Sequence, residues 1–463
     1  MKSGYSAILI ALLSLAGCRL GPNYKRPPVD TPPTYRGATQ AGAPNAPSLG
    51  DEKWWTVFQD PQLQQLIRTA LAENYDVRIA AARVLEAQAL LGITRADQFP
   101  TITAGASASD IRIPQTKQLP AVDTSGNELS LSLFWELDFW GKFRRATEAA
   151  RANLLATEWG QRVVMTTLVS NVATAYFQLR ELDLEMEISR QTLTTRQESL
   201  RLVKVRQQGG VTSKMDVYQS EQLVYFASAN IPDLERRIEQ QENFISVLIG
   251  KNPGPVVRGR KLIENAIPAT VPAGLPSALL ERRPDIQAAE QQLVAANARI
   301  GVAKAAYFPQ IVLTGSAGTR SSALTELFSG PAGAWNFGAQ LTQPLFTGGR
   351  IRSGVRLSEA QQEEAALFYR RTIQEAFREV SDSLVAYTKN QEFRQQQELL
   401  TRSAENATSL SRVRYSGGAT SYLEVLDSDT RYFSAQLALA QAELNERLAL
   451  VQVYNALGGG WEQ

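Results

Sequence analysis

The sequence predicts an α+β membrane protein made mostly of long α-helices, with four β-strands and an internal two-fold repeat. The repeat is directly visible, because Gly209-Gly210-Val211-Thr212-Ser213 returns 208 residues later as Gly417-Gly418-Ala419-Thr420-Ser421. Each copy holds two segments in which apolar and polar residues alternate, which is typical of β-strands. Each copy then continues into a long stretch without proline, which is typical of a long helix.

The composition excludes several classes of function. The 463 residues carry 48 basic and 46 acidic side chains, for a net charge of +2, so there is no broad basic surface for nucleic acid. The chain has no histidine, one cysteine and four methionines. Most general bases, nucleophilic dyads and soft metal ligands are therefore missing. We expect no enzymatic activity, no metal site, no cofactor apart from covalent lipid, and no nucleic-acid partner.

The first eighteen residues predict export and lipid attachment. Lys2 supplies a positive start, and residues 7–15 form an apolar run that is short for a membrane span. Leu15-Ala16-Gly17-Cys18 then looks like a bacterial lipobox, which predicts that Cys18 becomes the acylated first residue of the mature protein. Each buried methylene contributes about 0.8 kcal/mol, so several acyl chains anchor firmly. Position 19 is an arginine, whereas an aspartate there would resemble an inner-membrane retention signal, so we expect sorting to the outer membrane. The alternative to a lipobox is an ordinary signal peptide with an incidental cysteine.

The chain is predicted to divide into five parts. They are a signal peptide, a lipidated extended segment, a first repeat, a connector and a second repeat, at residues 1–17, 18–53, 54–250, 251–276 and 277–463. Phe99-Pro100 returns as Phe308-Pro309, which supports the alignment of the two repeats. A period this long indicates a duplicated structural unit and not a solenoid of small repeats.

Each repeat is predicted to begin with a helix and a β-hairpin. In the first repeat the helix runs from about Pro61 to Asp97 and stops at Phe99-Pro100. The hairpins are expected at about 101–139 and about 310–346. The clearest alternation places one set of side chains on a common face: Leu129, Leu131, Leu133, Trp135, Leu137 and Phe139.

The predicted strands have the length of membrane strands. About eleven residues at about 3.3 Å each suit a tilted crossing of the hydrocarbon layer. Trp135, Phe139 and Trp140 cluster where an interfacial aromatic belt is expected. A soluble sandwich uses alternating strands too. Four strands cannot close a barrel, however, so transmembrane strands here require several chains.

A very long helix is predicted after each hairpin, from Lys142 to about Gln207 and from Ser353 to Ser416. At about 1.5 Å per residue each extends near 95 Å, and such a helix needs partners along its length. An alternating three-four spacing predicts the seam: Val172, Ala175, Leu179, Leu182, Met186, Leu193 and Leu200. The helices reverse at tips near 207–215 and 415–423. A long soluble coiled coil is the alternative, but it needs neither strand pairs nor a lipobox.

Taken together, these residues resemble the TolC-like outer-membrane efflux ducts, most closely the lipidated branch that includes OprM and the NodT-type lipoproteins. The resemblance covers nearly the whole chain. Its motifs are Gly21-Pro22-Asn23-Tyr24 after Cys18, Trp54-Trp55 with Phe58 and Asp60-Pro61, Trp135 to Lys142, Arg282-Arg283-Pro284-Asp285-Ile286, and Tyr415-Ser416-Gly417-Gly418 before Leu423 to Asp427.

The resemblance implies a homotrimer. Its four strands per chain would form one twelve-stranded β-barrel in the outer membrane, continued by a twelve-helix α-helical barrel through the periplasm. The implied partners are outer-membrane lipid, a periplasmic adaptor and an inner-membrane pump, with the adaptor docking at the tips. Gly209, Gly210, Gly417 and Gly418 are expected there because glycine accepts the positive φ that ends a helix. Simple helix capping is the alternative to adaptor contact.

A periplasmic gate is implied near the second tip. Glu424 and Asp427 are three residues apart on a helix and so share a face. In the family, acidic residues at the matching positions form rings near the closed end of the tunnel. Asp216 is the corresponding residue in the first repeat. Tyr415 matches a tyrosine that tethers the closed state. Thr420 stands where TolC has a tunnel-closing arginine, so the lock is expected to rest more on packing. A merely solvated helix face is the alternative.

The predicted function is a passive duct of a tripartite efflux pump, which exports small molecules or drugs and opens when the adaptor binds. The outer-membrane duct of a type I protein secretion system is one alternative. A lipid-anchored structural coiled coil without transport is the other, and it predicts neither a β signal nor a trimer.

Overall fold

The computed structural model describes residues 19–38, 48–115, 117, 120–264, 268 and 271–461, so Cys18 and the predicted signal peptide lie outside the described residues. The chain forms two compact units. Unit 1 contains residues up to Pro28, Arg83–Thr157 and Ala288–Tyr369, and unit 2 contains Val29–Ala82, Glu158–Gln287 and the chain from Arg370 onward. Both halves of the sequence therefore contribute to both units.

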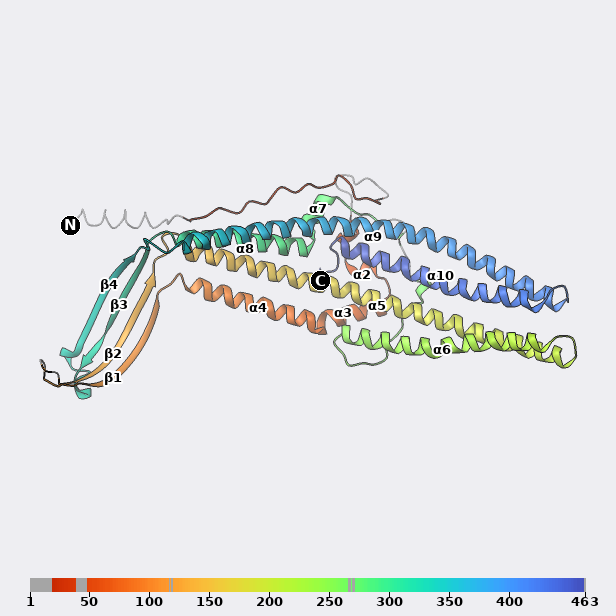
Figure 1. Ribbon diagram of the computed structural model, residues 1–463, viewed down its shortest axis with the longest axis horizontal. Helices are drawn as coiled ribbons and strands as arrows, with labels where there is room; N and C mark the ends of the chain where they lie inside the picture. Colours follow the sequence, from red (N-terminus) through yellow and green to blue (C-terminus); the bar gives the residue numbers. More distant parts are fainter. Residues whose placement is uncertain are drawn as a thin grey trace. The chain divides into compact units, whose positions relative to one another are not determined.

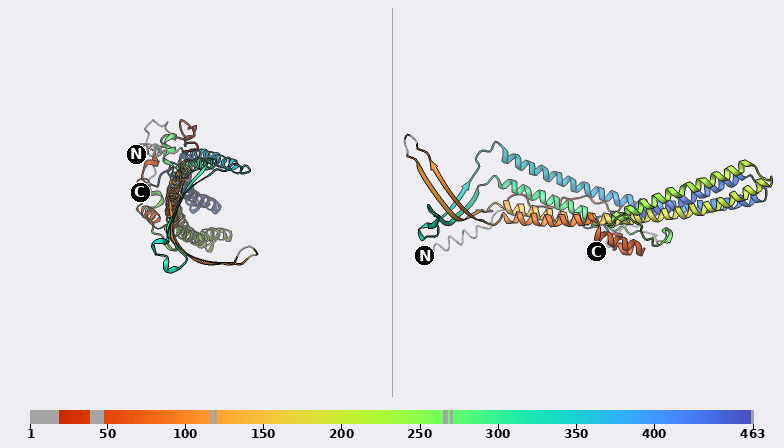
Figure 2. Two further views of the ribbon diagram at one scale, coloured as in Figure 1. Left: turned by 90° about the vertical axis from the view of Figure 1, so that its left-hand side faces the viewer. Right: turned by 90° about the horizontal axis from the view of Figure 1, so that it is seen from below.

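Unit 1 contains the β-sheet. Its strands are β1 (Thr101–Ile113), β2 (Val122–Glu136), β3 (Gln310–Ser321) and β4 (Gly333–Thr342). They form one antiparallel sheet in the order β1-β2-β3-β4 (Figure 1). The sheet is curved and not flat (Figure 2). The four predicted strands are confirmed, and the β2–β3 ladder, in which Leu131 lies opposite Ala317, joins strands from the two halves of the sequence.

The sequence alternation in β2 continues beyond the strand itself. The strand was predicted to include Leu137 and Phe139, but it ends at Glu136, so that boundary is wrong. The reason is the following helix. The carboxylate of Asp138 accepts hydrogen bonds from the backbone N–H groups of Phe143 and Arg144, which caps the helix that begins at Lys142.

The predicted helix from Pro61 to Asp97 is also wrong as a single element. It is two helices, α3 (Pro61–Glu73) and α4 (Tyr75–Ala96). Asn74 separates them in an extended conformation, with φ −62° and ψ 132°. Its side-chain oxygen accepts from the N–H groups that open α4, and its amide donates to the carbonyl of Leu248 at 2.9 Å. An N-cap residue inside a helical pattern therefore redirects the chain.

The second half has the same break. There α7 (Pro276–Arg282) is followed by α8 (Pro284–Ala305). The buried guanidinium of Arg283 lies at the junction and donates to Asp285, Glu379 and the carbonyl of Ala456. Hydrogen bonds to the two carboxylates raise the pKa of Arg283 against the opposing effect of its burial, so the guanidinium stays charged.

The four long helices form two hairpins. In the first, α5 (Lys142–Gln208) returns as α6 (Lys214–Leu248), and in the second α9 (Arg350–Ser416) returns as α10 (Tyr422–Ala456) (Figure 1). Both α5 and α9 contain 67 residues, which confirms the predicted long helices. The predicted seam is buried at Ala175 and Leu179, which pack against Ile245 of α6 and Val256. No helix among the described residues is both long and apolar enough to cross a membrane.

The short elements complete the fold. They are the helix α2 (Trp54–Val57) and the 3-10 turns η1 (Leu49–Asp51), η2 (Leu262–Glu264), η3 (Leu324–Glu326) and η4 (Gly330–Ala332). In unit 2 the buried carboxylate of Asp60 joins several of the segments. It accepts from the N–H of Gln62 at the start of α3, from Tyr176 Oη of α5 at 2.8 Å and from the N–H of Arg260 at 2.9 Å.

The N-terminal segment, residues 19–28, belongs to unit 1 and has no helix or strand in its described part. It is held by side chains of the helices beside it. Arg145 of α5 donates to the carbonyl of Leu20 at 3.0 Å and to Asn23 Oδ1 at 2.8 Å. Glu290 of α8 accepts from Arg26 Nη2 at 2.7 Å. These contacts bind the segment to α5 and α8.

Candidate gate at the helical turns

The turn between α5 and α6 is closed by backbone hydrogen bonds. The N–H of Val211 donates to the carbonyl of Arg206 at 2.9 Å, and the N–H of Gly210 donates to Gln207 at 3.1 Å. Gly210 has φ +71°. Two such backbone hydrogen bonds around a residue with a positive φ form a Schellman motif, which satisfies the last carbonyl groups of a helix. Ser213 then caps α6.

The turn between α9 and α10 repeats this geometry. The N–H of Ala419 donates to the carbonyl of Arg414 at 2.8 Å, and the N–H of Gly418 donates to Tyr415 at 3.1 Å. Gly418 has φ +75°. The two predicted double-glycine turns are therefore alike in backbone geometry. Only the second glycine of each has a positive φ, so only that one requires glycine for its conformation.

Substitution of the second glycines should therefore weaken both turns. Gly210→Ala combined with Gly418→Ala forces alanine into the left-handed region, which costs about 1–2 kcal/mol per site. No atom lies within 4 Å of a Cβ added at either position, so backbone strain is the whole effect. Amide exchange at the turns should accelerate by about 5- to 30-fold. Gly209→Ala with Gly417→Ala is the matched control, and equal acceleration in both variants would refute this reading.

Asp216 has a local role in the first turn. Its carboxylate accepts from the N–H of Ser213 at 3.3 Å and from the hydroxyl of Thr212, while its own N–H donates to Ser213 Oγ. This reciprocal arrangement is a capping box. The residue predicted as a first-repeat gate position thus stabilises the start of α6, and its part in a gate stays a prediction.

Glu424 and Asp427 each have an arginine partner from their own hairpin. Glu424 accepts from Arg414 Nη1 of α9 at 2.8 Å and from the hydroxyl of Thr420. Asp427 accepts from Arg431 Nε, one turn along α10, at 2.9 Å. Sequence reasoning did not find these arginines, although the i, i+4 spacing of Asp427 and Arg431 is a recognised signal. Thr420 thus donates a hydrogen bond to Glu424, and its part in a gate stays a prediction.

Tyr415 connects the two turns. Its ring lies 5.2 Å from the ring of Tyr422, and the Arg206 guanidinium of α5 lies 4.6 Å from its centroid. Val203 of α5 packs with Tyr422 and Val425, and Tyr415 is part of the same apolar cluster. The structure therefore brings Tyr415 and the end of the first hairpin together by a cation–π contact with Arg206 and by apolar packing.

A second connection between the hairpins was missed by sequence reasoning. Asp429 of α10 accepts from Arg196 Nε of α5 at 2.8 Å and from Arg412 Nη2 of α9 at 2.6 Å. The side chains of Arg196 and Asp429 are 2% and 8% exposed. Phe433 completes the contact, because its ring lies 5.0 Å from the Arg196 guanidinium and 6.3 Å from the ring of Phe226 of α6. All four long helices meet there.

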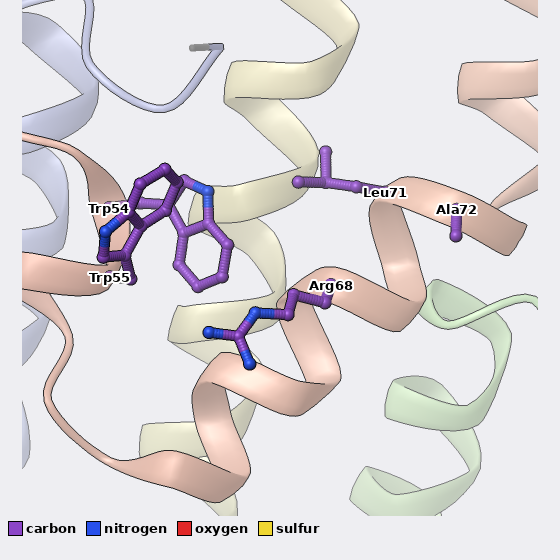
Figure 3. Close-up of a pocket in the computed structure, with 5 residues that line it drawn as sticks. All are labelled: Trp54, Trp55, Arg68, Leu71 and Ala72. Atoms are coloured by element: carbon purple, nitrogen blue, oxygen red, sulfur yellow. The ribbon is translucent and has the colours of Figure 1, made fainter. Parts of the chain in front are cut away.

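The Trp54-Trp55 motif borders an apolar pocket of about 420 Å³ in unit 2. Figure 3 shows Arg68 extending from α3 toward the two indoles, with Leu71 and Ala72 further along the same helix. The indole rings are perpendicular with centroids 5.3 Å apart, and the Arg68 guanidinium lies 5.8 Å from the Trp54 ring. The motif packs α2 against α3.

Comparison with known proteins defines the class of this fold. The open-state structure of the Neisseria gonorrhoeae MtrE outer membrane channel matches with a TM-score of 0.88 and 31% identity, covering 96% of this chain and 99% of that one. The solvent efflux pump outer membrane protein SrpC of Pseudomonas putida is 39% identical over 461 residues, 98% of this chain and 97% of SrpC. The cation efflux system protein CusC of Escherichia coli O6:H1 is 35% identical over 456 residues, 97% of each chain.

Paired long helices joined to a four-stranded antiparallel sheet thus define an outer-membrane channel of the efflux type, with the TolC-like α+β fold that the sequence predicted. The profile described as "Outer membrane efflux protein" matches residues 66–251 and again residues 275–459. The chain belongs to the outer membrane efflux protein family, and the predicted resemblance is confirmed.

Proposed function

We propose that this protein is the passive outer-membrane duct of a tripartite efflux system, which exports small molecules pushed by an inner-membrane pump. The observation that carries the proposal is the match to efflux-pump outer-membrane proteins over almost the whole chain. The family consists of channels, so we assign the protein no catalytic reaction and no cofactor.

The proposed assembly is a homotrimer. The outer strands β1 and β4 each pair on one side only within the described chain, so each offers an edge to a neighbour. Three copies of the four-stranded sheet supply the twelve strands of one barrel, and three copies of the two hairpins supply a twelve-helix tunnel. Acylation of Cys18 adds a lipid anchor. A periplasmic adaptor is proposed to dock at the turns around Gly209-Gly210 and Gly417-Gly418.

In this assembly the second turn supplies the gate. Glu424 and Asp427 lie on the first turns of α10, and the threefold axis gathers their carboxylates around the narrow end of the tunnel, where they attract cations. Arg414 and Arg431 balance this charge within each chain. Opening separates the second hairpin from the first, which disrupts the Tyr415–Arg206 contact.

Conductance tests the assignment. Glu424→Ala combined with Asp427→Ala, measured on the purified full-length protein in planar bilayers, is expected to raise the ion conductance, because it breaks the Arg414–Glu424 and Arg431–Asp427 ion pairs at the closed end. Asp233→Ala is the control, since Asp233 is an exposed carboxylate paired with Arg236 on α6. Unchanged conductance in the double variant would remove the gate assignment. Absence of any channel in the wild type would remove the duct.

A further inference from the structure

Two carboxylates lie one helical turn apart on the first long helix. Glu181 of α5 is 3% exposed, and its Oε1 is buried without a hydrogen-bond partner. Glu185 lies four residues further along α5, on the same face of the helix. A carboxyl group that is buried without a hydrogen-bond partner favours its neutral form, because burial of an unpaired charge is costly. We therefore infer that Glu181 holds a proton.

One cation serves both carboxylates. Arg237 of α6 donates from Nη1 to Glu185 Oε2 at 3.1 Å. Glu185 and Arg237 are the charged groups that act on Glu181. Burial first, and then the neighbouring Glu185, raise the pKa of Glu181 to about 8.

The other charges near this level of α5 are already paired. Arg180 donates to Asp183 at 2.5 Å and also to the carbonyl of Arg260. Arg258, which follows the first hairpin, is held by Asp183 and Glu242. Within the described part of the chain, Arg237 is thus the guanidinium that compensates Glu181 and Glu185.

The hydrogen-bond pattern of α6 is interrupted beside the part of α5 that carries Glu181 and Glu185. Pro232 is inside the helix and has no N–H, so the carbonyl of Ser228 loses its helical hydrogen bond. Two residues on, Leu234 packs against Leu182 and Met186 of α5. Next to Pro232, α6 is held to α5 by this apolar cluster and by the Arg237–Glu185 ion pair, and further along by the packing of Ile245 against Ala175 and Leu179.

The second hairpin lacks all of these features. At the 208-residue displacement, Glu181 and Glu185 correspond to Lys389 and Phe393, and Pro232 corresponds to Ala440. The acidic pair and the interrupted helix occur together in the first hairpin and are both missing from the second. Any response that they produce is confined to α5 and α6.

We propose that Glu181, Glu185 and Pro232 form a proton-operated hinge in the first hairpin. With the proton on Glu181 in place, α6 packs against α5. When the proton leaves, the buried anion of Glu181 and the neighbouring anion of Glu185 face one guanidinium, and α6 bends away from α5 at Pro232. The effect of this bend on the tunnel rests on the function proposed above, whereas the bend itself does not.

The direction of the pH response follows from the raised pKa. A glutamate in the unfolded chain loses its proton near pH 4.5, whereas Glu181 in the folded protein keeps it until about pH 8. The folded state therefore binds more protons over this interval, and its stability falls as the pH rises through it. The packed hinge is expected at pH 6 and the open hinge at pH 9.

Hydrogen exchange of the full-length protein in detergent tests the hinge. After correction for intrinsic exchange rates, peptides covering residues 228–240 should exchange at least about 10-fold faster at pH 9 than at pH 6. Glu181→Gln should abolish this difference, because an amide stays neutral at both pH values. Glu185→Gln should reduce it, because one guanidinium then faces one anion, although Glu181 stays buried. Glu235→Gln, an exposed carboxylate on α6 beside Arg190, should retain it.

Pro232→Ala tests whether the proline is required for the bend, because it leaves Glu181 and Glu185 unchanged. It restores the N–H, so the pH-dependent exchange should shrink around residue 228 while the wild-type response remains large. Equal protection of the wild type at both pH values would overturn the proposal, as would a full pH response in both glutamine variants. Bilayer conductance at the same pH values is a separate arm. A pH-dependent exchange in a protein that forms no channel supports the hinge and removes only the duct.

Discussion

Replacing Asp429 by alanine is expected to loosen the contact between the two helical hairpins by about 3–5 kcal/mol. The reason is that the variant leaves a buried guanidinium without its counter-ion. The Arg196 side chain is 2% exposed, and its Nη1 donates to the carbonyl of Leu223 at 3.1 Å. Arg412 loses the same carboxylate. Amide exchange in α10 around residue 429 should accelerate by at least about 100-fold.

The matched control lies two residues away on the same helix. Asp427 also pairs with an arginine, but the side chains of Arg431 and Asp427 are 75% and 60% exposed. Such a surface pair at i, i+4 contributes only about 0.3–0.5 kcal/mol, so Asp427→Ala should change the exchange by about twofold. Similar acceleration in both variants would show that burial does not set the strength of the Asp429 bridge.

A compensated variant separates charge from packing. Arg196→Met combined with Asp429→Leu removes both buried charges and fills the space with apolar atoms, which in other buried pairs is neutral or stabilising. We expect it to recover most of the protection lost in Asp429→Ala. If it does not, the hairpins are held by the Arg412–Asp429 hydrogen bond and by the contact of Arg196 with the Phe433 ring, and the cost of Asp429→Ala is not that of an uncompensated charge.

The elements that could be predicted from the sequence are those with a local periodic pattern of residues. The absence of proline over α5 and α9 and the alternation in β2 depend on nearest neighbours, so helices and strands could be located within a few residues. The break at Asn74 could not be located. Its signal is a single capping residue whose amide is held by the carbonyl of Leu248, 174 residues away.

The candidate gate likewise contains features that could be predicted from the sequence and features that could not. The double-glycine turns were predictable because a positive φ demands glycine at Gly210 and Gly418. The partner of Asp427, four residues along the same helix, was within reach of helical spacing rules. The Arg196–Asp429 bridge was not, because 233 residues separate its members and no local pattern marks a buried ion pair. Long-range polar contacts are specified by the fold.

Replacing Arg145 by alanine is expected to release the N-terminal segment, residues 19–28, from unit 1. Arg145 is 1% exposed, and its guanidinium donates to the carbonyls of Leu20 and Gly21, to Asn23 and to Glu148. Hydrogen bonds from a charged donor contribute about 1.5–3 kcal/mol each, so their joint loss should exceed 3 kcal/mol. Limited proteolysis and amide exchange of residues 19–28 measure the release.

Two variants make this test specific. Arg151→Ala removes an exposed arginine from the same helix and should leave the N-terminal segment protected. Gly301→Val attacks the contact from the other side, because a Cβ at Gly301 would lie 2.5 Å from the Leu20 carbonyl oxygen and 2.8 Å from Arg145 Cγ. It should therefore release the segment with Arg145 intact. Protection that survives both Arg145→Ala and Gly301→Val would mean that the segment is held from Tyr24 and Arg26 onward.

The Arg145→Ala variant also distinguishes two ways in which the protein can be held in the membrane, by acyl chains on Cys18 and by the folded sheet. Leu20 follows the predicted acylation site, Cys18, by two residues, so Arg145 fixes the chain almost at the anchor. If acyl chains on Cys18 act independently of the sheet, Arg145→Ala should stay in the membrane fraction while residues 19–28 become accessible to protease. Cys18→Ala should then lose the lipid but keep the segment protected. Loss of the folded sheet in Arg145→Ala would instead make the bound segment a structural requirement of unit 1.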